Sequence, residues 1–164
     1  MSNKYILKNY TDLSNPLLGT KILSYSDQFF APAKRMLNQN DPIFKENLFD
    51  NHGKWMDGWE TRRKRTKGND YVIIKLGKPG KVRLIDVNTY FFNGNQPEHI
   101  QIQGGYSQNN NIKNLKLINL KKKNKVKPNS KNLFKSLTSK TLTHVKLKIY
   151  PDGGVARLRL FGDI

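Results

Sequence analysis

Strict alternation of apolar and polar residues is the strongest pattern along the chain. In His99–Gln103 two isoleucines share one face, and polar side chains occupy the other. Thr143–Tyr150 alternates in the same way. A period of two is typical of a half-buried β-strand, so both segments are predicted to be strands. In the second strand, three residues are predicted to face outward: His144, Lys146 and Lys148.

A turn and a further alternating segment follow the second strand. Pro151–Gly154 is predicted to turn, because proline fixes φ and glycine permits positive φ. In Ala156–Leu160, apolar residues then alternate with arginines. We therefore expect Thr143–Tyr150 and Ala156–Leu160 to pair as a hairpin that closes the domain.

The middle of the chain contains further strand patterns. The continuous apolar run in Tyr71–Leu76 indicates a central strand that is buried on both sides. Gly77–Gly80 predicts a turn, after which Val82–Val87 is expected to pair as the neighbouring strand. Leu115–Leu120 is expected to form another strand. Pro32–Leu37 is the one helical candidate, since proline suits the first turn of a helix.

Many short strands separated by Gly, Pro and Asn predict an all-β fold. At 164 residues, we expect one domain, an antiparallel jelly-roll β-sandwich. Residues 1–18 are expected to be a partly ordered N-terminal arm, with the domain at 19–164. The chain has no cysteine, no apolar run long enough to span a membrane and no secretory signal, so a cytoplasmic location is expected.

The net charge of +18 raises the alternative of a polyanion-binding protein. Lysines crowd residues 113–140 together with asparagine and serine, which is typical of a solvated loop or a sheet edge. Few aromatic residues are interleaved there to stack on bases. A chain rich in both lysine and asparagine is also expected from an AT-biased genome. Nucleic-acid binding is therefore the less favoured interpretation.

The densest unusual segment is Gly53–Arg65, which holds two tryptophans, two carboxylates and several cations. This mixture is poor strand material and too polar for a core. Loops that combine aromatic side chains with both signs of charge often line small-molecule sites. We therefore expect a binding site in this segment.

Five segments together resemble the allantoicase family. Gly53–Arg65 resembles its GKWMDGWETRRKR signature, and Ser26–Ala33 resembles its DEFFAPA segment. Tyr71–Gly77, Asp86–Asn95 and Thr143–Arg159 are similar to three further family motifs in the same order. The resemblance implies a galactose-binding-like jelly roll that hydrolyses allantoate to ureidoglycolate and urea.

The chain also departs from the family pattern. Allantoicases usually carry two repeats, and this chain has room for one, which resembles the first. Gln28 replaces a glutamate, Asn69 a histidine and Asn88 an aspartate. The resemblance therefore implies a homo-oligomer (a dimer or higher) or a second-repeat chain as partner. The alternatives are a non-catalytic small-molecule or carbohydrate-binding module, or the partner subunit of a split allantoicase.

The chemistry that the resemblance implies needs proton transfer and a cation for the substrate carboxylate. The proton-transfer candidates are Glu60, Asp57 and His144. The substrate-binding candidates are Arg62, Arg63, Trp55, Trp59, Asn95 and Arg157. Structural roles remain alternatives, including salt bridges for the charged residues and core packing for the tryptophans. Asp152 is expected to cap its own turn.

No metal motif is present, because His52, His99 and His144 are far apart in sequence. No cofactor is expected. A divalent metal held by residues distant in sequence stays an open alternative.

Overall fold

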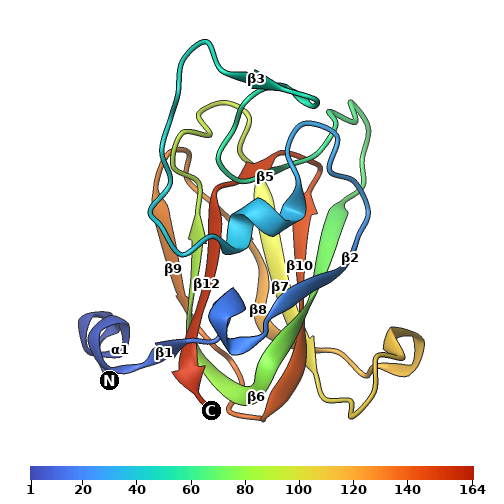
Figure 1. Ribbon diagram of the computed structural model, residues 1–164. Helices are drawn as coiled ribbons and strands as arrows, with labels where there is room; N and C mark the ends of the chain where they lie inside the picture. Colours follow the sequence, from blue (N-terminus) through green and yellow to red (C-terminus); the bar gives the residue numbers. More distant parts are fainter.

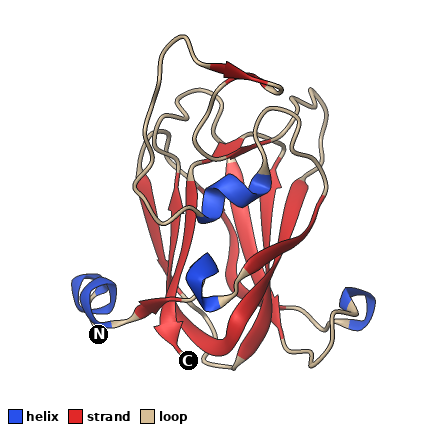
Figure 2. Cartoon of the chain, viewed as in Figure 1, coloured by secondary structure: helices blue, strands red, loops and turns tan.

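The computed structural model describes residues 1–164 as a two-layer antiparallel β-sandwich, which confirms the predicted fold class (Figures 1 and 2). Its helical segments are α1 (Asn3–Asn9) and the short 3₁₀ turns η1 (Pro16–Leu18), η2 (Ala33–Leu37) and η3 (Ile112–Asn114). Its strands are β1 (Thr11–Asp12), β2 (Lys21–Tyr25), β3 (Phe49–Asp50), β4 (Gly53–Lys54), β5 (Trp59–Glu60), β6 (Asp70–Asn88), β7 (His99–Gly105), β8 (Ile118–Lys125), β9 (Lys131–Lys135), β10 (Leu142–Tyr150), β11 (Gly154–Val155) and β12 (Arg157–Asp163).

Strand β6 belongs to both layers. Its first half pairs with β2 and β10, and β10 continues the layer to β7 and β8. Its second half pairs with β9 and β12, and β12 continues to β1. The prediction that Gly77–Gly80 forms a turn between two paired strands was therefore wrong. This segment instead carries one long strand from one layer into the other.

The glycines of this segment are needed for close approach. A Cβ on Gly77 would collide with the backbone of Leu18, and one on Gly80 would lie 2.5 Å from the carbonyl oxygen of Asp163. Small residues here let the chain ends pack against β6 where it changes layer. The segment is therefore suited to a crossing rather than to a reversal.

The predicted hairpin of β10 and β12 was also wrong. β10 pairs with β6 and β7 in one layer, while β12 pairs with β1 and β6 in the other. The turn at Pro151–Gly154 therefore connects the two layers at one end of the sandwich. Alternation correctly predicted both strands, but it carries no information on which strands become neighbours.

Lysine-rich β8 forms an edge of its layer, pairing with β7 alone. This confirms the edge interpretation, although the strand starts at Ile118 and includes lysines that were expected to follow it. The lysine side chains lie over aromatic rings: Lys123 Nζ is 4.3 Å from the Tyr150 centroid, and Lys121 Nζ is 5.1 Å from that of Phe134. Charged edge strands resist pairing with other chains.

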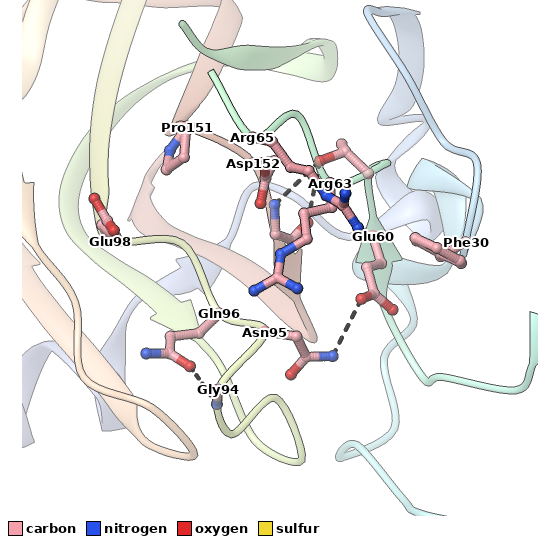
Figure 3. Close-up of a pocket in the computed structure, with 12 residues that line it drawn as sticks. Phe30, Glu60, Arg63, Arg65, Gly94, Asn95, Gln96, Glu98, Pro151 and Asp152 are labelled. Atoms are coloured by element: carbon pink, nitrogen blue, oxygen red, sulfur yellow. Dashed lines mark hydrogen bonds between the residues drawn. The ribbon is translucent and has the colours of Figure 1, made fainter. Parts of the chain in front are cut away.

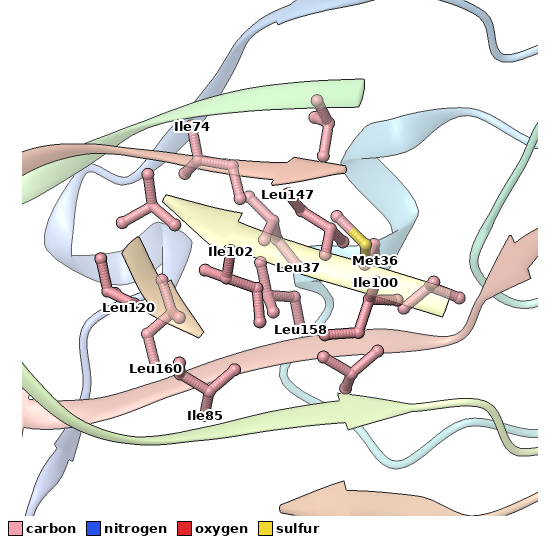
Figure 4. Close-up of a cluster of buried hydrophobic side chains, with 14 of the residues drawn as sticks. Met36, Leu37, Ile74, Ile85, Ile100, Ile102, Leu120, Leu147, Leu158 and Leu160 are labelled. Carbon is pink, nitrogen blue, oxygen red and sulfur yellow. The ribbon is translucent and has the colours of Figure 1, made fainter. Parts of the chain in front are cut away.

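The core lies between the layers and is formed by the predicted inward faces (Figure 4). Ile100, Ile102 and Leu147 are fully buried there. His144, which was predicted to face outward, lies outside the hydrophobic core cluster but is fully buried, and its Nδ1 lies 2.7 Å from Thr143 Oγ1. Burial and the charge of Lys75 lower the pKa of His144.

The N-terminal residues pack on the sandwich. β1 pairs with the end of β12, and Leu13 is 1% exposed within the core. Helix α1, which sequence analysis did not predict, begins with the Ser2 side chain accepting a bond from Tyr5 N. η2 confirms the helical prediction at Pro32–Leu37. No helix has the length and apolarity needed to cross a membrane.

The buried carboxyl group of Asp86 should make the stability of the fold depend on pH. It lies buried on β6, near Lys131, Arg159 and Asp12, and burial raises its pKa to about 6. The folded state then binds this proton more tightly than the unfolded state, so stability falls as pH rises from about 4 through 6. We expect Asp86 to contribute a loss of ~3 kcal/mol over this range.

The measurement is denaturant unfolding between pH 4 and 7 for the parent and Asp86→Asn, with exposed Asp41→Asn as the control. Asp86→Asn should lose this part of the pH slope, whereas Asp41→Asn should keep it. Equal slopes in the parent and Asp86→Asn would contradict the assignment.

Candidate functional site

A polar cavity of about 560 Å³ opens at the loop end of the sandwich (Figure 3). Three loop segments line it, together with Phe30: residues 60–65, 94–98 and 151–153. The first belongs to the segment that sequence analysis selected, and the last contains the turn after β10. The cavity thus joins parts of the chain that are nearly one hundred residues apart.

Backbone hydrogen bonds hold the three loops together. β5 pairs with β11, with Glu60 opposite Gly154. Thr61 N donates to the carbonyl oxygen of Gly153 at 3.0 Å, and Gly153 N donates to Thr61 Oγ1 at 3.1 Å. Gly154 N donates to the carbonyl oxygen of Asn95 at 2.8 Å. The cavity wall is therefore built largely from paired main chain, which limits its movement.

Gly153 is required at this junction. Its φ is +131°, and an added Cβ would lie 2.8 Å from the carbonyl oxygen of Asn95. Because of both observations, a residue larger than glycine could not be placed here unless the surrounding backbone rearranged. The glycine pair that predicted a turn also brings the turn against the loop at residues 94–98.

Glu60 is the titratable group with a perturbed pKa in this cavity. Burial raises its pKa, the hydrogen bond from Asn95 Nδ2 at 3.1 Å lowers it, and the charge of Asp152 raises it, with a net upward shift. Asp152 does not cap its own turn as expected. Its Oδ2 accepts a bond from Lys64 N at 2.7 Å, which ties the turn to the loop after β5.

Two arginines line the cavity, Arg63 and Arg65, and no salt bridge occupies either of them. Arg62 does not line it, because its guanidinium lies over the Phe29 ring, 4.2 Å from the centroid. Sequence analysis selected Arg62 and missed Arg65. No period in the sequence marks Arg65, because residues 61–65 form no strand and Arg65 has a φ of +60°; its signal was its place in the cation-rich segment Gly53–Arg65.

Asp57 and Arg157 form a buried ion pair away from the cavity. Arg157 Nη2 lies 2.8 Å from Asp57 Oδ2, with the side chains 1% and 6% exposed. Arg157 also donates to the carbonyl oxygens of Arg35, Asn40, Asp57 and Ala156. Asp57 Oδ2 accepts a further bond from Ile43 N. This geometry supports the structural alternative for both residues, because their polar groups are already satisfied.

The tryptophans do not line the cavity either. Trp59 is fully buried in the core, where its Nε1 donates to the carbonyl oxygen of Asp27. Trp55 contacts Arg35, whose Cζ lies 5.3 Å from the ring centroid. The geometry supports the core alternative for Trp59, and one tryptophan thereby anchors the segment that carries Glu60.

His144 lies far from the cavity along β10. It pairs with Gly105, whereas Tyr150, next to the cavity residue Pro151, pairs with His99. Six residues of extended strand span ~20 Å. The structure therefore brings Glu60, Arg63 and Asn95 together from the predicted set and leaves His144 elsewhere.

The three departures from the family pattern also lie outside this cavity. Gln28 Oε1 accepts a bond from Ala33 N at the start of η2. Asn88 is buried, and its Oδ1 accepts a bond from Tyr90 N. Asn69 lines a neighbouring hollow with Lys67. None of the three contributes a side chain to the cavity lining that contains Glu60. No group of three or more His, Asp or Glu side chains is arranged to hold a metal ion.

The fold and cavity define a galactose-binding-like jelly roll with a charged site at its loop end. Residues 11–164 match the model of the allantoicase repeat, and the chain belongs to the allantoicase family. This confirms the resemblance. A relative from Acinetobacter baylyi, named "Probable allantoicase", is 46% identical over 158 residues, which cover 96% of this chain and 47% of the relative.

Comparisons with solved structures agree with the family and the fold. The crystal structure of an allantoicase from Saccharomyces cerevisiae has a TM-score of 0.82 and 32% identity, covering 96% of this chain and 50% of that one. A family 32 carbohydrate-binding module from Clostridium perfringens, solved with galactose, has a TM-score of 0.63 at 14% identity and covers 92% of this chain and 98% of its own; this likeness shows the fold alone. The chain spans about half the length of the curated relatives it matches.

The Asp57–Arg157 pair generates a stability prediction. Asp57→Ala leaves the Arg157 guanidinium buried without its counter-charge, so the free energy of unfolding should fall by about 3–5 kcal/mol. Denaturant unfolding measures this change. Exposed Asp41→Ala, which breaks no ion pair, is the control and should stay within about 0.5 kcal/mol of the parent. Equal losses in the two variants would show that the pair does not stabilise the fold.

Proposed function

We propose that this chain is an allantoicase repeat that hydrolyses allantoate to ureidoglycolate and urea. The observation that carries the proposal is the cavity in the family's signature segment, where Glu60 faces the unpaired cations Arg63 and Arg65. Allantoate has one carboxylate and two ureido groups on one carbon. The cavity offers a partner for each kind of group.

Arg63 and Arg65 are proposed to bind the substrate carboxylate. Guanidinium groups match a carboxylate with two parallel hydrogen bonds, and both arginines are free of salt bridges. The net charge of +18 also favours the approach of a small anion. Asn95 is proposed to bond a ureido group from the opposite side of the cavity.

Glu60 is proposed to protonate the leaving ureido nitrogen. A carboxyl with a raised pKa keeps its proton closer to neutral pH, as a general acid requires. The oxygen of water bonds to the central carbon and gives up one proton to solvent, and the carbon–nitrogen bond breaks as nitrogen receives the proton of Glu60. Solvent then protonates Glu60 again. Asp57, His144 and Arg157 have no part in this proposal, because they lie outside the cavity.

We also propose that this repeat works beside a second allantoicase repeat. The support is that the chain spans about half the length of the relatives it matches.

The Glu60→Gln variant tests whether Glu60 acts as the general acid. The variant keeps the shape and the bond from Asn95 but cannot deliver the proton, so urea release from allantoate should fall roughly 10²- to 10⁴-fold. Exposed Glu46→Gln is the matched control and should retain turnover. Assays with and without a chelator measure any metal requirement separately. Near-normal turnover in Glu60→Gln would remove Glu60 from the mechanism.

Substitutions of Asp152 and Asn95, the two neighbours of Glu60, should shift the pH dependence of turnover in opposite directions. Turnover should decline on the alkaline side as Glu60 loses its proton. Asp152→Asn removes a negative charge and should move this decline to lower pH, while Asn95→Ala removes a bond to the carboxylate and should move it to higher pH. The pH dependence of kcat measures both shifts. Shifts in the same direction would contradict this account of Glu60.

A further inference from the structure

A second cavity lies on the other side of Glu60. It has a volume of about 440 Å³ and shares Phe30, Glu60 and Asn95 with the polar cavity. Its remaining wall is largely apolar, with Phe44, Met56 and Phe91. We propose that this aromatic cavity binds the planar, neutral ureido group that leaves as urea. This inference rests on the proposed function and assigns the two sides of Glu60 to different parts of the substrate.

The turn that carries Phe91 is built to present its ring. Phe91 has a φ of +70°, which is costly for a bulky residue. Neighbouring hydrogen bonds maintain it: Tyr90 N donates to Asn88 Oδ1 at 2.8 Å, Phe91 N to Asn129 Oδ1 at 3.0 Å, and Phe92 N to the carbonyl oxygen of Thr89 at 2.9 Å. The ring is nevertheless 41% exposed, so core packing does not explain the conformation.

Two aromatic rings form one face of this cavity. Phe44 and Phe91 are stacked, with centroids 5.9 Å apart and an interplanar angle of 23°. Lys54 Nζ lies 5.1 Å from the Phe44 centroid and contributes a positive rim. Both residues are exposed by about two-fifths. No cation lies over the Phe91 ring, so a flat, uncharged group can stack on it without displacing Lys54.

The polar groups of this cavity suit a ureido group. Asn93 and Asn95 provide amides, and the Nδ2 of Asn95 is already bonded to Glu60, which leaves its Oδ1 for a ureido N–H. The polar cavity has the guanidinium groups of Arg63 and Arg65 beside the carboxylates of Glu98 and Asp152, whereas the cation of the aromatic cavity is the Lys54 ammonium. A guanidinium group can hold a carboxylate with two parallel hydrogen bonds and an ammonium cannot. This difference in donors orients the substrate: its carboxylate lies on the arginine side, and its leaving group lies on the phenylalanine side.

This placement is consistent with the reaction. The oxygen of water bonds to the central carbon and gives up one proton to solvent, while the carbon–nitrogen bond breaks with its electron pair passing to nitrogen. Glu60 gives that nitrogen its proton and is protonated again from solvent. The products are ureidoglycolate on the arginine side and urea on the aromatic side. Because Glu60 lines both cavities, its carboxyl group lies between the two product sides, next to the carbon–nitrogen bond that breaks in this orientation.

The Phe91→Gly variant tests the aromatic cavity as a binding subsite without straining the backbone of the turn. Glycine adopts a positive φ freely, so the variant removes the ring while favouring the backbone. Phe49→Ala is the control, since Phe49 is 68% exposed and lines neither cavity. We expect Phe91→Gly to raise the KM for allantoate and to weaken product inhibition by urea, each roughly five- to tenfold. Phe49→Ala should change neither.

A binding experiment separates this inference from the proposed function. N-carbamoylglycine, which carries one ureido group and one carboxylate, is titrated into the parent and both variants while backbone NMR shifts are followed. Binding that perturbs residues 91–95 and weakens in Phe91→Gly alone supports the subsite even if the chain releases no urea. Equal affinity in the parent and Phe91→Gly, or no binding to the parent, would overturn it.

Discussion

The guanidinium of Arg157 is the contact on which the arrangement of the loop end depends. It lies at the start of β12, almost completely buried, and its donors reach four backbone carbonyl oxygens and the carboxylate of Asp57. A buried charge is tolerated only when it is paired and hydrogen-bonded, so the loops from Arg35 to Asp57 must close around it. Glu60 follows Asp57 by three residues. A group that lies outside the cavity thus positions the chain that enters it.

Fold class could be predicted because alternation reports burial directly. Ile100 and Ile102 are buried, as their spacing requires, and the same holds for Leu147 in β10. Pairing could not be predicted in this way. Gly77–Gly80 has the composition of a turn, yet it lies within β6, because the same small residues that permit a reversal also permit close backbone contact. Composition does not distinguish these two uses of glycine.

The candidate site could be predicted only in part, because the sequence of a loop does not report which way each of its side chains points. The segment Gly53–Arg65 contributes residues to the cavity lining, but its side chains divide among three environments: Asp57 pairs inside the protein, Trp59 enters the core, and Glu60 lines the cavity. A loop without regular periodicity gives no rule for this division. The same holds for Arg65, which lies outside any strand with a φ of +60°, so that no period in the sequence identifies it as a lining residue.

The two cavities share Phe30, Glu60 and Asn95 and otherwise differ in the side chains that line them. The polar side gathers cations from the signature segment, and the aromatic side gathers rings from residues 30, 44 and 91. Glu60 and Asn95 form the boundary between them. In the proposed orientation this boundary gives complementarity to a substrate with one charged group and flat neutral arms on the same carbon: the carboxylate meets guanidinium groups, and a neutral arm meets the phenylalanine rings. The departures at Gln28, Asn69 and Asn88 leave this complementarity intact, since none of them lines either cavity.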